Sequence, residues 1–312
     1  MDSILFHPLR SLKQNDLHPY DTKFHKASRL LHLRRSHSRL IPMNFTSIYL
    51  ICSALVVSTS LGAPGQYATA TWLCSDENTH PDGTIRTIIK MNVDEGWHTY
   101  WKNPGEGGLP LSIEATLPKG WSIGEILYPV PKRFKSGELP GFGYEGEVVF
   151  PISLTPPAEY GGELPPLKAT LSWLTCNDET CVPGKANLTL PSKTDPEKIS
   201  KAYDNLPKLV PGANLTVEED GASLKLTLKL PEEWNVDISE FEVFPVTQNV
   251  IDSAADFHFR NEADILKSWT ATVPKSEYFD KLPEKLTLLL ADRDGTAWLI
   301  STPPRPVPDG QG

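Results

Sequence analysis

Two cysteines near the middle of the chain form the segment with the clearest chemical potential. Cys176 and Cys181 flank four polar residues, Asn-Asp-Glu-Thr, and strand-like sequence lies on either side. A four-residue hairpin loop would place the two cysteines opposite each other, with Cα atoms about 4.5–5.5 Å apart, which a disulfide can bridge. The spacing therefore predicts a Cys176–Cys181 disulfide on an accessible hairpin.

The residues alone leave three uses open for this pair: redox exchange, a structural disulfide and metal binding. A six-residue loop stabilises a fold by only about 2 kcal/mol, against roughly 4.7 kcal/mol for a loop of about a hundred residues. Pairing Cys74 with Cys176 would close such a long loop and is the competing connection. Asp178 and Glu179 are acidic neighbours of the kind that raise a thiol pKa, so the pair is expected to accept and pass electrons without being a strong oxidant.

A second chemically rich stretch is GWHTYWKNPG at residues 96–105, with three aromatic residues and a histidine. Its rings could wall the cysteine loop, bind a ligand, or fill the core and cover an edge as an ordinary strand. His98 is a candidate proton donor to the thiols or, with both cysteines, part of a soft Cu(I) site. A metal site would need His80 or His258 to be recruited by the fold, so we predict no bound metal and no cofactor.

Composition and charge exclude several other functions. The 312 residues include 29 prolines and 21 glycines, which favours short strands and many turns over long helices. Residues 64–312 hold 22 basic and 36 acidic residues, a balance of −14, which is unsuited to nucleic acid or anionic lipid. The sequence contains no phosphate-loop or His-Glu-x-x-His motif.

Residues 1–70 are interpreted as an N-terminal extension and export signal. Arginines precede an uncharged apolar stretch at 48–63, and small residues follow it. An uncleaved membrane anchor is the alternative, although the stretch is shorter than the roughly 20 residues that span a bilayer. We expect a mature periplasmic or secreted chain with no membrane span, in a compartment where paired cysteines stay oxidised.

Strand-like segments recur at short intervals through the rest of the chain, separated by Gly- and Pro-rich turns that include 103–105 and 139–143. The first series occupies 67–74, 84–93, 111–117, 147–154, 167–175 and 186–190. Asp195-Pro196-Glu197 is typical of a helix start and predicts a short helix to about residue 204. The second series occupies 214–219, 223–230, 241–245, 269–273, 285–290 and 297–301, with turns at 219–221 and 292–295.

These patterns predict an all-β protein: two immunoglobulin-like β-sandwich domains joined by a short helical linker. The predicted boundaries are 71–192 for the first sandwich, 193–209 for the linker, 210–302 for the second sandwich and 303–312 for a Pro-rich tail. The second sandwich has no cysteine and only one histidine, which favours a supporting or partner-docking role.

Four motifs, in this order, together resemble a known family. They are WHTYWKNPGEGGLP at 97–110, YPVP at 128–131, FGYEGEVV at 142–149, and WLTC followed by CVPG within 173–184. This series is similar to the N-terminal periplasmic domain of DsbD-type thiol:disulfide interchange proteins, and most of all to the ScsB-like branch, which is linked to copper tolerance. The resemblance covers about residues 67–192.

The resemblance implies an immunoglobulin-like sandwich whose cysteine pair, here Cys176 and Cys181, takes electrons from a membrane-embedded reductant and passes them to periplasmic disulfide-bearing proteins. Tyr100 and Phe142 are the candidates for the aromatic residues that shield the pair in relatives. The reductant is expected to be a separate chain, and the protein would then be a protein-disulfide oxidoreductase-type electron relay. The alternative is a non-catalytic binding or scaffold module with a structural disulfide, in copper handling or cytochrome c maturation.

Overall fold

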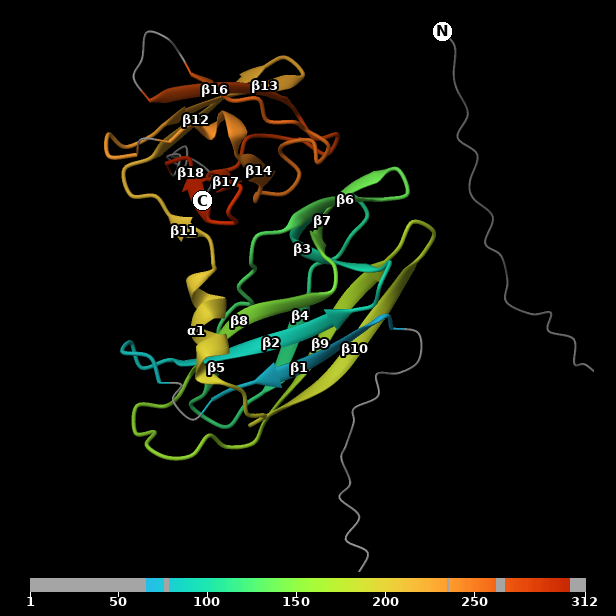
Figure 1. Ribbon diagram of the computed structural model, residues 1–312, viewed down its shortest axis with the longest axis vertical. Helices are drawn as coiled ribbons and strands as arrows, with labels where there is room; N and C mark the ends of the chain where they lie inside the picture. The colour runs from blue at the N-terminus through green and yellow to red at the C-terminus, as the bar shows by residue number, and fades with distance from the viewer. Residues whose placement is uncertain (1–65, 76–78, 235, 262–266, 304–312) are drawn as a thin grey trace, which may run out of the picture. The chain divides into compact units, whose positions relative to one another are not determined.

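The computed structural model describes residues 66–75, 79–234, 236–261 and 267–303 (Figure 1). All of them fall within one compact unit, Ser58–Gly312. This part of the chain is mostly β, with one short α-helix and several antiparallel sheets, as the sequence predicts. Residues 1–65 of the predicted extension and export signal, and 304–312 of the Pro-rich tail, lie outside the described residues. No described helix is long and apolar enough to cross a membrane.

The first β region consists of strands β1 to β10, arranged in two sheets. One sheet has the order β1 (Ala68–Leu73), β2 (Ile85–Val93), β8 (Glu147–Thr155) and β5 (Ser122–Ile123). The other has the order β10 (Cys181–Leu190), β9 (Leu167–Cys176), β3 (His98–Gly105), β7 (Leu139–Tyr144) and β6 (Lys132–Ser136), and β4 (Ser112–Thr116) pairs with β9. Every pairing in these two sheets is antiparallel.

Alternation along β9 produces the core of this region. Leu167, Ala169, Leu171 and Trp173 are buried and belong to one apolar cluster, as the period of two in the sequence predicts. The facing sheet contributes Trp72, Ile89 and Phe150 among others to the same cluster. The strands that carry the cysteines therefore rest on a packed apolar layer.

Two Gly- and Pro-rich segments that the sequence analysis assigned to turns are strands, so that prediction was wrong. Residues 103–105 end β3, and residues 139–143 belong to β7. The glycines are required there because strands and rings approach closely: a Cβ at Gly143 would overlap the Thr99 backbone, and one at Gly141 would overlap the Phe134 ring. Gly141 and Gly143 therefore allow close packing within the sheet, and neither is in a turn.

The second β region consists of strands β11 to β18 and follows helix α1 (Pro196–Asp204). Asp195 caps this helix by accepting from the backbone N–H of Glu197, as its sequence predicts. One sheet has the order β11 (Lys208–Leu209), β18 (Ala297–Ser301), β17 (Thr287–Ala291) and β14 (Glu242–Pro245). The other has the order β12 (Asn214–Asp220), β13 (Ser223–Lys229), β16 (Ser268–Pro274) and β15 (Arg260–Asn261). A second apolar cluster lies between these sheets.

Polar and aromatic contacts connect strands β3, β6 and β7 to the second β region. The Arg133 guanidinium donates to the carbonyl oxygens of Val243 and Ser253, at 2.6 and 3.2 Å. The Asn103 amide donates to the carbonyl oxygen of Pro245 at 2.7 Å. These contacts hold in place the strands that stand beside the cysteine hairpin.

Candidate redox-active disulfide site

Cys176 and Cys181 form a disulfide at the end of the β9–β10 hairpin, as the spacing predicts. Their Cα atoms are 4.1 Å apart, and the two residues are the last register pair of the ladder. Figure 1 shows β9 and β10 as a long antiparallel pair. The ladder reaches the cysteines although Pro183 lies in β10, because β10 is an edge strand and an edge position tolerates a residue without an N–H.

The side chain of Asn177 holds the four-residue loop between the cysteines. Its Oδ1 accepts from the backbone N–H groups of Glu179 and Thr180, at 3.0 and 2.8 Å. Its own backbone N–H donates to the Thr180 carbonyl at 3.0 Å. Asparagine commonly forms such local turns, so the loop is held by its first residue.

The two cysteines differ sharply in exposure. Cys176 is 0% exposed, whereas Cys181 is an exposed residue. Disulfide exchange requires an attacking thiolate to reach one sulfur of the bond. The arrangement can therefore react with another protein through Cys181, while Cys176 stays beneath the surface.

His98 is the cross-strand neighbour of Cys176. Strand β3 pairs with β9 so that His98 is opposite Cys176 and Thr99 is opposite Thr175. Opposite residues in an antiparallel pair project from the same face, with Cβ atoms about 4.5–5.5 Å apart. The fold thus brings together the cysteine pair and the histidine that the sequence analysis singled out separately.

Two rings enclose His98. The ring of Phe134, on β6, lies 3.8 Å from the imidazole between centroids, and the ring of Tyr100 lies edge-on at 5.4 Å. His98 is 5% exposed, and burial lowers its pKa below the usual 6.5, against the opposing effects of Glu145 and Asp178. Burial also raises the pKa of Tyr100. Both side chains are therefore neutral near pH 7.

Phe142 has a different location from the other predicted shielding residues. It is 0% exposed and packs edge-on against Trp101 and Phe244, in the contact between the first and second β regions. Phe134 is the ring that lies on His98, and the sequence analysis did not select it. The signal that could have found it is the KRFKS segment at 132–136, a short strand that pairs with β7 through Gly141.

The β6–β7 turn also touches the cysteine loop. The Ser136 hydroxyl donates to the carbonyl oxygen of Asn177 at 3.1 Å. A Cβ placed on Gly137 would lie 3.6 Å from the carbonyl oxygen of Asp178, so the two turns are in close proximity. Phe134 and the turn after it therefore form one side of the disulfide site.

The part of the chain that contains this site matches a known protein family. Residues 70–193 match the sequence profile of the family described as thiol:disulfide interchange protein DsbD, N-terminal. This segment is a DsbD N-terminal domain. The match contains both cysteines, His98, Tyr100, Phe134 and Phe142.

Solved structures extend the likeness beyond the DsbD N-terminal domain. The chain is similar to the crystal structure of the N-terminal periplasmic domain of ScsB from Proteus mirabilis, with 21% identity and a TM-score of 0.54. That match covers 76% of this chain and 92% of the other, so it also includes part of the second β region and shows a shared fold.

Two further structural matches are too weak to indicate a shared fold. They are a chaperone–tip adhesion subunit complex of Csu pili from Acinetobacter baumannii and the human Desmocollin-1 ectodomain, each 10% identical, with TM-scores of 0.15 and 0.18. They cover 77% and 78% of this chain, and 99% and 53% of the matched chains. Comparison with curated protein sequences found no significant match.

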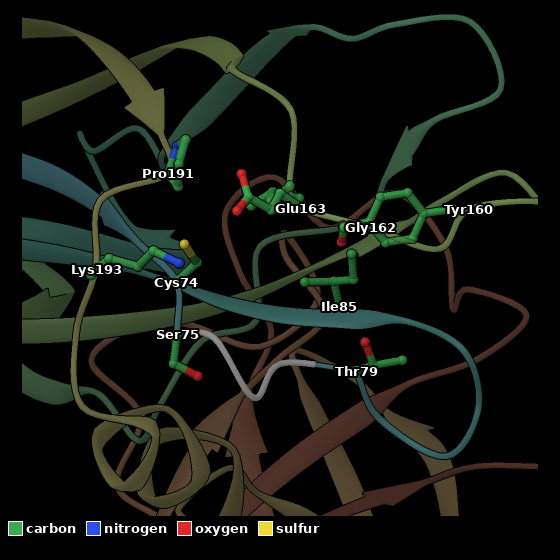
Figure 2. Close-up of a pocket in the computed structure, with 10 residues that line it drawn as sticks. Cys74, Ser75, Thr79, Ile85, Tyr160, Gly162, Glu163, Pro191 and Lys193 are labelled. Atoms are coloured by element: carbon green, nitrogen blue, oxygen red, sulfur yellow. The ribbon is translucent and has the colours of Figure 1, made fainter.

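Cys74 lies at the other end of the DsbD N-terminal domain and takes no part in the disulfide. It is 1% exposed and forms an isolated β-bridge with Lys193, beyond the end of β10. Because Cys176 is bonded to Cys181, the competing Cys74–Cys176 disulfide is not formed. Cys74 lines a pocket of about 360 Å³. Figure 2 shows it there together with Lys193, Glu163 and Tyr160. Strand β10 begins at Cys181 and its ten residues end just before the pocket residue Pro191, which corresponds to roughly 30 Å along the strand.

Metal ligands do not cluster in the part of the chain that the structure describes. No group of three or more His, Cys, Asp or Glu side chains there is arranged to hold a metal ion. His80 lies beside Asp82, with 3.0 Å between Nδ1 and Oδ1, and His258 is in the second β region. Neither joins His98 at the cysteine pair.

Proposed function

We propose that this chain carries out thiol:disulfide interchange outside the cytoplasm through the Cys176–Cys181 pair. The observation that carries the proposal is a hairpin-end disulfide with one exposed and one buried cysteine, inside a DsbD N-terminal domain. A separate membrane-embedded reductant supplies electrons, and exported disulfide-bearing proteins receive them. Export by the N-terminal signal is part of the proposal, and the similarity to a periplasmic ScsB domain supports it.

Exposure assigns the two cysteines different roles. In the reduced protein, the Cys181 thiolate attacks a partner disulfide, forms a mixed disulfide and releases one partner sulfur as a thiolate. Cys176 then attacks Cys181 Sγ, which restores the Cys176–Cys181 bond and releases the second partner sulfur. The partner gains two electrons and the cysteine pair loses two. Reduction by the membrane protein follows the same steps in reverse.

The organisation of the chain is proposed together with its function. Residues 71–192 form the exchange domain, 193–209 the linker, 210–302 a supporting domain and 303–312 a tail, and both sandwiches are immunoglobulin-like. The separate apolar clusters of the two β regions support this division. Apolar side chains of the second region, such as Phe244 and Leu289, also join the first cluster, which is consistent with a supporting role.

The competing function is a binding or scaffold module whose disulfide is structural. The second β region favours it, because its described strands form a complete second core and contain no cysteine. The two functions differ in the stability of the bond towards reduction. A structural disulfide resists the cellular thiol pool, whereas an exchange pair must be reduced and reoxidised in use.

The reduction potential of the whole chain separates these functions. Equilibration with glutathione buffers should give a potential of about −200 to −250 mV if the pair exchanges, and a potential below about −300 mV would mark a structural bond. A Cys176→Ala chain, incubated with oxidised glutathione, should accumulate a mixed disulfide at Cys181. A Cys181→Ala chain should accumulate much less, because its remaining thiol is buried. Equal trapping at both positions would contradict the assigned roles.

A further inference from the structure

The buried cysteine of the pair raises a chemical problem that rests on the proposed function. Cys176 must become a thiolate to attack Cys181 in the second step of exchange. It is 0% exposed, and burial in apolar surroundings disfavours a thiolate. Bulk water cannot readily take the proton from such a site. A proton acceptor inside the site is therefore required.

His98 is placed to be that acceptor. It is opposite Cys176 in the β3–β9 ladder, and its side chain projects from the same face. Thr99 and Thr175, the next register pair, bond elsewhere. The Thr99 hydroxyl donates to the carbonyl oxygen of Leu174, and the Thr175 hydroxyl has the carbonyl oxygens of Gln66 and Val182 as alternative acceptors. His98 is thus the histidine that the ladder sets opposite the buried Cys176.

The imidazole has an atom available for the proton. Its Nε2 is buried and makes no hydrogen bond within the described residues. An unsatisfied buried polar atom is costly, and it is commonly retained where function needs it. In the tautomer with its proton on Nδ1, this Nε2 is an acceptor. Phe134 and Tyr100 close the site around the ring.

The electrostatic surroundings favour the neutral imidazole that a base requires. The groups that act on His98 are Glu145, after β7, and Asp178, in the cysteine loop, and both stabilise its protonated form. Burial outweighs them and lowers the pKa of His98. Tyr100, on the same strand, is neutral, and β6 contributes the uncharged ring of Phe134. The two carboxylates in turn would stabilise the imidazolium once a proton has arrived.

We propose that His98 is the general base that deprotonates Cys176 during resolution of the mixed disulfide. The proton moves from Cys176 Sγ to His98 Nε2, and the sulfur electron pair forms the bond to Cys181 Sγ. The bond between Cys181 and the partner sulfur breaks, and its electron pair leaves on the partner thiolate. The proton then passes from the imidazolium to that thiolate or to water. In the reverse direction the imidazolium returns a proton to Cys176.

The test separates the two steps of exchange in the full chain, with oxidised glutathione as the probe. The pre-reduced protein is mixed with the probe, quenched with acid at successive times, and the mixed disulfide is counted by mass spectrometry. His98→Gln should slow the resolution step at pH 7 by about 100-fold, in the usual range for a general base, and leave the first step unchanged. His258→Gln makes the same change at an exposed site and should alter neither step.

If His98→Gln does not fold, the pH dependence of the resolution rate in the unmodified chain tests the same inference. Resolution should slow as pH falls through the pKa of His98, below 6.5, and the substituted chain should lack this inflection. A resolution rate in His98→Gln within twofold of the unmodified chain, with an unchanged profile, would overturn the inference and leave the exchange function intact. If the unmodified chain forms no mixed disulfide, the proposed function itself fails.

Discussion

The two ends of the first β region each contain a buried cysteine, yet only one of these cysteines is in the Cys176–Cys181 disulfide. At the disulfide end, Cys176 is joined to an exposed Cys181 and faces His98 across the sheet. At the opposite end, Cys74 is buried beside Lys193 at a pocket with Glu163 and Tyr160 (Figure 2). Cys74 and Cys176 are both buried, so burial alone does not distinguish the two positions.

The difference lies in what surrounds each sulfur. A thiol takes part in disulfide exchange when a second sulfur is within reach and when its surroundings allow it to become a thiolate. The hairpin supplies the second sulfur, and the cross-strand histidine supplies a titratable neighbour. Cys176 and Cys181 are bonded to each other, and Cys74 is not part of that disulfide. The three described cysteines thus have different structural surroundings.

The largest expected effect comes from removing each cysteine in turn. Cys176→Ala and Cys181→Ala should each abolish the release of two glutathione molecules from one oxidised glutathione, because the pair is needed to complete exchange. Cys74→Ala should retain full exchange and lose about 1 kcal/mol of unfolding free energy for the lost buried atom. Thiol release and chemical denaturation measure the two quantities. Loss of exchange in Cys74→Ala would remove the distinction between the two ends.

A smaller effect is expected from the ring that covers the disulfide end. Phe134→Ala removes the side chain that lies on His98, so reduction of the disulfide by dithiothreitol should become several-fold faster. The pKa of His98 should rise towards 6.5 because water reaches the imidazole, which a histidine NMR titration would detect.

Phe257→Ala is the matched control for this change. Phe257 is a partly buried ring in the second β region and stacks on Phe259. Both substitutions should cost about 2 kcal/mol of unfolding free energy, and only Phe134→Ala should change the reduction rate. Equal reduction rates in the two variants would show that Phe134 does not limit access.

The smallest effect is expected at the Cys74 end, in the β1–β2 connection. Asp82 accepts from the backbone N–H and the hydroxyl of Thr84, at 2.9 and 2.7 Å, and these bonds, helped by His80, lower the pKa of Asp82 from 3.8 to about 2. Because the folded pKa is the lower one, the stabilisation is present above about pH 4 and is lost as pH falls towards 2.

Asp82→Asn should therefore be less stable than the unmodified chain at neutral pH, and the difference should shrink between pH 4 and 2. Denaturation at several pH values measures it, and Thr84→Val should reproduce part of the loss. The rate of exchange should be the same in all three proteins. A change in exchange rate would mean that the two ends of the first β region are coupled.

Much of the secondary structure could be predicted from local patterns. The α1 start at Asp195-Pro196 and the β9 alternation each depend on residues a few positions apart, and both predictions are confirmed. The strand at 139–144 was missed because glycine and proline usually mark turns. The strand at 132–136, KRFKS, was missed because it is short and has only one apolar residue. In β7 the glycines serve close approach to Thr99 and Phe134, which only the paired strand can reveal. The immunoglobulin-like topology and the domain boundaries stay predictions.

The sequence by itself predicted the disulfide, because a four-residue hairpin loop places Cys176 opposite Cys181. Only the tertiary structure decided the rest of the site. Pairing of β3 with β9 sets His98 beside Cys176 across more than seventy residues of chain, and β6 places Phe134 on the imidazole in preference to Phe142. Strand order and burial are products of global packing, so no local spacing could have shown which cysteine is exposed and which is enclosed.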